Sequence, residues 1–130
     1  MKLPVNLYIP VGAKLLKERE NRLNRAERGR AKILGYNTMG LSGTGSYGRY
    51  QAYKFDLEVW SEYKAPYKTS SCWNVYDMGV PKVQEGNEID VKIDADDPNI
   101  VYPMEQSVEF SWTGAMMLMG AMMSGRKEKS

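Results

Sequence analysis

The stretch 84–103 constrains the fold most, because it has the pattern of a strand, a tight acidic turn and a second strand. Apolar and charged residues alternate over 88–94, which is the period of a strand with one face toward solvent. Aspartate and asparagine dominate the turn over 94–99, and a short strand over 100–102 ends at Pro103. The stretch therefore predicts a small β domain that contains an antiparallel hairpin.

Three further segments predict strands. Residues 50–60 alternate between apolar and charged side chains, residues 67–76 are rich in Thr, Trp, Tyr and Val, and residues 30–36 form the first strand. The glycine-rich segment 37–49 is expected to be a connection, and 78–85 a loop. Five short strands joined mostly by hairpins predict a small antiparallel barrel or rolled sheet, with an OB-like barrel as the nearest named architecture.

Helices are expected on both sides of this barrel, which gives a mainly β fold with flanking helices (α+β). Residues 11–28 consist of good helix formers, with Gly29 in the position of a C-terminal cap. Residues 112–124 predict a second helix, which is rich in methionine. The expected organisation is an N-terminal arm and basic helix over 1–29, a β-barrel domain over 30–103 and a methionine-rich helical tail over 104–130.

The composition excludes several classes of function. The chain of 130 residues suits one domain, and its net charge of +2 does not by itself imply a polyanionic partner. Histidine is absent, which removes the commonest general base and zinc ligand, and Cys72 is the only cysteine. We therefore expect no enzyme activity, no cofactor and no metal. Neither a secretory signal nor a long apolar span is predicted, so a cytoplasmic or membrane-associated location is favoured.

The charges are unevenly distributed along the chain. Residues 14–30 hold seven basic and three acidic residues, whereas residues 85–105 hold seven acidic residues and one lysine. Such segregation can guide association with partners, including copies of the same chain.

Two motifs have both a functional and a structural interpretation. Residues 43–48 match G-x-G-x-x-G, but a strand follows where a dinucleotide site needs a helix, so a loop between strands is favoured. Asp94, Asp96, Asp97 and Asn99 could bind calcium. A hairpin turn in which these side chains accept hydrogen bonds from the backbone is favoured instead.

The methionine-rich helix has three candidate locations. Its thirteen residues reach about 20 Å, which is shorter than the roughly 30 Å hydrocarbon core of a bilayer. It can pack on the barrel, contact another chain through its adaptable methionines, or enter lipid. The candidate interaction residues lie on the two flanking helices: Lys14, Lys17, Arg22, Arg25, Arg28, Trp112, Met116, Met119 and Met123.

Residues 28–102 resemble an uncharacterised bacterial family of small β domains that are often tethered to a membrane. The resemblance rests on the motifs Gly-Arg-Ala-Lys-Ile at 29–33, Phe-Asp-Leu-Glu-Val at 55–59 and Ile-Asp-Val-Lys-Ile-Asp at 89–94, followed by Asp-Pro-Asn-Ile-Val at 97–101. It implies an OB-like barrel and a membrane location, and it implies no particular activity.

These observations predict a non-catalytic interaction or assembly module whose partner is a protein, with a second copy of the chain as one candidate. Two alternatives remain open. One is a membrane-associated β domain anchored by residues 104–125. The other, less favoured, is an OB-like binder of single-stranded nucleic acid, suggested by tyrosines and tryptophans close to a basic segment.

Overall fold

The computed structural model describes residues 11–118 and the side chains of residues 17–118. Within this range the chain forms a helix, three long strands, a 3-10 helix and three short strands. A further helical segment follows at 112–118. The elements are α1 (Val11–Arg25), β1 (Glu27–Gly45), β2 (Gly48–Trp60), β3 (Tyr67–Tyr76), η2 (Asp77–Val83), β4 (Glu88–Ile93), β5 (Val101–Pro103) and β6 (Val108–Phe110).

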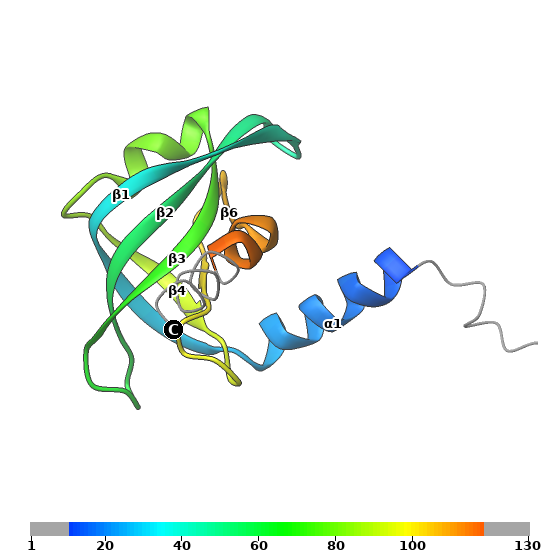
Figure 1. Cartoon of the computed structure of the whole chain (residues 1–130). Helices are drawn as coiled ribbons and strands as arrows, with labels where there is room; N and C mark the ends of the chain where they lie inside the picture. Colours follow the sequence, from blue (N-terminus) through cyan, green and yellow to red (C-terminus); the bar gives the residue numbers. More distant parts are fainter. Residues whose placement is uncertain (1–10, 119–130) are drawn as a thin grey trace, which may run out of the picture.

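The described strands form a six-stranded antiparallel sheet in the order β5-β4-β1-β2-β3-β6. The sheet curls into a nearly closed barrel (Figure 1). Its two edges approach where the rings of Tyr102 on β5 and Phe110 on β6 lie 5.2 Å apart. This confirms the expected mainly β barrel with flanking helices. The strand count is six rather than five, because β6 lies in the segment that was expected to be a helical tail.

The segment 37–49 is not a loop, so that prediction was wrong. β1 continues through it to Gly45, and Gly45 pairs with Gly48 at a tight turn into β2. The register is interrupted between Thr38 and Ser42, where Gly40 adopts a φ of 71° that favours glycine. Backbone hydrogen bonds to β2 hold these residues in a strand although their small polar side chains contribute little to strand propensity.

Two other boundaries also differ from the sequence prediction. α1 ends at Arg25 rather than at residue 28, and Gly29 is not a helix cap but a member of β1 opposite Val91. A Cβ atom at position 29 would lie 2.6 Å from the carbonyl oxygen of Trp60, so close backbone approach requires the glycine. The expected loop over 78–85 is largely the 3-10 helix η2, which buries Gly79 and Val83.

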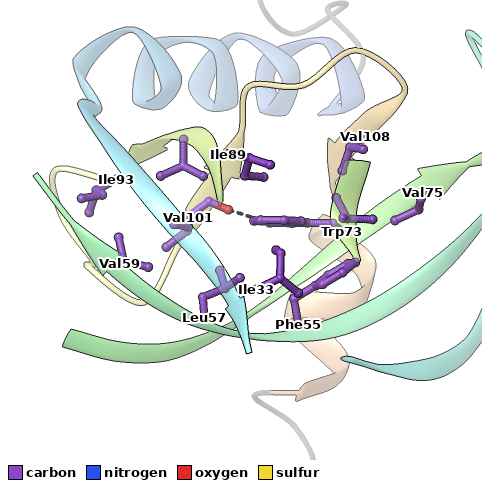
Figure 2. Close-up of a cluster of buried hydrophobic side chains, with 13 residues drawn as sticks. Ile33, Phe55, Leu57, Val59, Trp73, Val75, Ile89, Ile93, Val101 and Val108 are labelled. Atoms are coloured by element: carbon purple, nitrogen blue, oxygen red, sulfur yellow. Dashed lines mark hydrogen bonds between the residues drawn. The ribbon is translucent and has the colours of Figure 1, made fainter. Parts of the chain in front are cut away.

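The core lies inside the barrel and is built from the inward faces of the strands (Figure 2). The predicted alternation is confirmed in β2, where Phe55, Leu57 and Val59 are buried, and in β4, where every second residue is buried. Trp73 is fully buried, and its indole N–H donates to the carbonyl of Val101 over 2.9 Å. This bond satisfies a polar group in the core and ties β3 to β5.

Candidate functional site

The candidate site lies at one end of the barrel, where α1, the turn after β4 and the segment after β6 meet. It is organised around Asp94, which directly follows β4 and is 3% exposed. One carboxylate oxygen accepts hydrogen bonds from the backbone N–H groups of Asp96 and Asp97, each over 3.0 Å. Asp97 in turn accepts from the backbone N–H of Asn99. These bonds confirm the hairpin turn predicted for the acidic segment.

The same carboxylate holds α1 to the barrel. The Arg22 guanidinium donates from Nε to Oδ1 over 3.1 Å and from Nη2 to Oδ2 over 2.7 Å, which is a bidentate ion pair. The hydroxyl of Tyr102 on β5 also donates to Oδ1. The Asp94 side chain is 1% exposed and that of Arg22 is 29% exposed. A buried carboxylate therefore joins a helix to two strand ends.

The electrostatics of this arrangement favour a charged Asp94. Burial acts to raise the pKa of Asp94, but hydrogen bonds from Arg22, Tyr102 and the backbone outweigh it and hold the pKa below its usual range. Burial raises the pKa of Tyr102, and its bond to the Asp94 carboxylate raises it further. The aspartate is thus ionised and the phenol protonated at neutral pH, which is the combination that the geometry requires.

Trp112 connects this ion pair to the C-terminal segment. The guanidinium carbon of Arg19 lies 4.8 Å from the centre of the Trp112 ring, and that of Arg22 lies 5.7 Å away. Both distances are typical of cation–π contacts. The Trp112 ring also packs against Phe110 at 4.8 Å and Tyr102 at 6.1 Å. We refer to Arg22, Asp94, Tyr102 and Trp112 together as the Asp94 junction.

The helical segment 112–118 covers the outer side of β3. The backbone N–H of Ser111 donates to the carbonyl of Cys72, and a Cβ atom at Gly114 would lie 2.9 Å from the Cys72 side chain. In its described part, this segment therefore packs on its own barrel, which was one of the three locations considered. Met116 and Met117 remain 69% and 47% exposed.

The basic and acidic segments lie next to each other and form ion pairs within the chain. Beyond Arg22, Arg25 pairs with Asp96 over 3.3 Å in an exposed position. Arg30 on β1 lies 2.7 Å from Asp90 on β4. Much of the charge segregation seen along the sequence is thus neutralised in the folded chain.

The predicted interaction residues fall into three groups. Arg22, Arg25 and Trp112 belong to the contacts described above, and they are joined there by Tyr102 and Phe110, which the sequence analysis did not select. Side chains at the surface are those of Lys17, Arg28 and Met116. The side chain of Lys14, and Met119 and Met123 entirely, lie outside the described residues.

Two observations concern metal binding and thiol chemistry in the described part of the chain. Among them, no group of three or more His, Cys, Asp and Glu side chains is arranged to hold a metal ion. Cys72 is buried, and burial raises the pKa of its thiol, which disfavours the reactive thiolate. The helices within residues 11–118 include none with the length and apolar character needed to cross a membrane.

The chain matches no protein-family model, no curated protein and no solved structure. The resemblance of residues 28–102 to a family of small bacterial β domains therefore stays a prediction.

Proposed function

We propose that this chain is a non-catalytic interaction module in which the barrel is a rigid platform for α1. The observation that carries the proposal is the position of α1, which runs away from the barrel and is attached near its C-terminal end (Figure 1). The partner we propose is another protein chain, and a second copy of this chain is the first candidate.

A projecting helix of this kind is expected to need further contacts. α1 has fifteen residues, and isolated helices of about that length are marginal in water. Its apolar positions form a narrow stripe, so its own amphipathicity provides little burial. The buried ion pair at Arg22 fixes the direction of the helix but contacts its last turns only. A partner that packs along the helix would add the apolar burial that its narrow stripe does not provide alone.

Charge also favours a protein partner. Three arginines form ion pairs within the chain, namely Arg22, Arg25 and Arg30, whereas the Lys17 side chain on α1 is exposed. Met116 is exposed on the neighbouring helical segment. Exposed methionine side chains adapt to varied apolar surfaces. The Lys17 ammonium favours a partner surface that carries acidic side chains. The combination suits a protein surface of mixed apolar and acidic character.

Size-exclusion chromatography with light scattering tests the proposal. We expect a mass above the 14.8 kDa of one chain, with the excess increasing with protein concentration and decreasing at high salt. The variant Lys17→Glu should weaken association, while Lys68→Glu on the exposed side of β3 should leave it unchanged. A mass of one chain at every concentration and salt would argue against self-association, and the absence of any partner in a pull-down would then contradict the proposal.

Membrane association is the second candidate. The observation in its favour is that exposed Met116 and Met117 lie on a segment adjacent to the basic α1, a combination that suits an anionic lipid surface. Sedimentation with vesicles that contain phosphatidylserine tests this idea. Recovery of the full chain in the supernatant would contradict it.

Nucleic-acid binding is less favoured. The tyrosines near the β1–β2 turn pack against one another, with the Tyr76 ring 5.3 Å from that of Tyr47 and 5.5 Å from that of Tyr50. The Tyr76 hydroxyl donates to the carboxylate of Glu109. Rings that pack together beside a carboxylate are less available to stack on the bases of a polyanion. A fluorescence titration with a labelled single strand at low salt would detect any binding.

A further inference from the structure

Two basic side chains face each other on the outer side of the barrel. Arg28 on β1 lies directly opposite Lys92 on β4 in the antiparallel register. Backbone bonds from Asp94 to Ile100 and from Met104 to Asp90 show that the even-numbered residues of β4 bond to β5. Lys92 therefore directs its backbone N–H and C=O toward β5, and Arg28 and Lys92 form a non-hydrogen-bonded antiparallel pair. In such pairs the two opposite side chains come closest together.

The acidic side chains around this pair are already engaged with other cations. Asp90 lies 2.7 Å from Arg30, and Glu88 lies 3.7 Å from the same guanidinium. Among the side chains described, neither Arg28 nor Lys92 has a carboxylate within 4.0 Å. Lys32 lies opposite Glu88 on the same face, so four cations and two carboxylates share this face of β1 and β4, which leaves an excess of two positive charges. Like charges placed directly opposite each other on a sheet are destabilising unless something compensates them.

A hollow beside the basic pair provides room for a compensating group. Its volume is about 260 Å³, and its lining residues are Arg28, Gly29, Asp90, Val91, Lys92 and Met104. Small-molecule sites typically measure about 300–1,000 Å³, so the hollow is small for a cofactor. It is large enough for the end of a single side chain. Both polar and apolar residues line it, and Met104 is one of the apolar residues.

We propose that this hollow binds the carboxylate of an acidic side chain on a protein partner. The Arg28 guanidinium offers the fork of N–H donors that fits a carboxylate, and the Lys92 ammonium offers a second cation. Met104 provides an apolar surface for the methylene groups of the same side chain. Asp90 also lines the hollow, and its carboxylate would repel a phosphate group, which carries about −1.5 to −2 at neutral pH, more strongly than a singly charged carboxylate.

This inference rests on the proposed function, because it names the chemistry that the partner of the interaction module must present. It also assigns a role to Arg28 that differs from the roles of Arg22 and Arg25. Those two residues are paired within the chain, whereas Arg28 is left for a group from outside.

A fluorescein-labelled hexaglutamate peptide provides the test, with binding followed by fluorescence anisotropy at low salt. The double variant Arg28→Ala/Lys92→Ala should lower affinity at least tenfold. The control Arg49→Ala/Lys68→Ala removes two exposed cations elsewhere and should change affinity by less than threefold. Arg28→Lys keeps the charge but removes the bidentate N–H donors of the guanidinium, and it should lower the affinity by an intermediate factor. Circular dichroism establishes that each variant is folded.

The location and the ligand class are tested separately. In nitrogen–proton NMR spectra, titration with the peptide should shift the backbone amide signals of Gly29 and Val91 before those of the β1–β2 turn. A hexapeptide with phosphoserine at alternate positions should bind more weakly than hexaglutamate. Stronger binding of the phosphopeptide, or equal losses in the two double variants, would overturn the inference. Absence of hexaglutamate binding by a chain that self-associates in light scattering would overturn it and leave the proposed function standing.

Discussion

Replacing Asp94 by asparagine should destabilise the fold more than any comparable change at the surface. The substitution preserves the size of the side chain but exchanges one acceptor oxygen for an NH₂ group. Oδ1 accepts from Arg22 and Tyr102, while Oδ2 accepts from Arg22 and from two backbone N–H groups. Either orientation of the amide therefore places a donor against donors, and it leaves the Arg22 cation without its counter-ion.

The magnitude follows from burial. Removing one partner of a buried ion pair costs about 3–5 kcal/mol. Arg22 is 29% exposed and can recover some hydration, so we expect a loss of about 2–4 kcal/mol for Asp94→Asn. The matched control is Asp96→Asn, two residues away. Its ion pair with Arg25 is exposed on both sides, so the loss there should stay below about 1 kcal/mol.

Urea unfolding followed by tryptophan fluorescence measures both variants. With an m-value of about 1–3 kcal/mol/M, a loss of 3 kcal/mol lowers the midpoint by about 1–3 M. Equal midpoints for Asp94→Asn and Asp96→Asn would refute the reasoning. The pH dependence provides a second readout. Because folding lowers the pKa of Asp94, its contribution is complete above about pH 5 and is lost as the pH falls through the folded-state pKa. The variant should therefore lose less stability in acid than the wild type.

Three further outcomes are expected. Gly79→Ala should cost about 1–3 kcal/mol, because its Cβ would collide with the carbonyl oxygen of Ser107, while Gly35→Ala, which has open space, should cost nothing measurable in the same urea assay. Trp73→Phe should lose about 1–3 kcal/mol by removing buried volume and a hydrogen bond, and an unchanged melting temperature would contradict this. Burial raises the pKa of Tyr76 to about 12, so an ultraviolet titration should show it ionising later than in the unfolded chain. Its contribution to stability should be complete below about pH 10 and lost as the pH rises toward 12.

Much of the barrel could be predicted because its signals are local. Over residues 55–60 of β2 and throughout β4, burial alternates residue by residue, so a few consecutive residues reveal the strand. The second half of β1 and the whole of β6 show no such alternation of apolar and polar residues. Residues 37–45 are mostly small or polar, and β6 contains three residues that form a strand because the edge of β3 is available to pair with them.

The Asp94 junction was predicted only in part, for a different physical reason. The sequence identified Arg22, Trp112 and the acidic turn as noteworthy, each within its own segment. Arg22 and Asp94 are 72 residues apart, and their pairing depends on β1 and β4 lying side by side. The sequence did not single out Tyr102, because a tyrosine in a short strand is as consistent with an ordinary core residue as with a hydrogen-bond donor to a buried carboxylate. Charge segregation along the chain was visible, but only the fold shows which charges neutralise each other.

The most direct test of the account is the mass of the wild type and of Asp94→Asn measured side by side by light scattering, at equal protein concentrations and under conditions where circular dichroism shows both barrels folded. If α1 is the contact surface and Asp94 fixes its direction, the wild type should exceed the 14.8 kDa of one chain and the variant should fall back toward it. Equal masses for the two proteins would contradict the account.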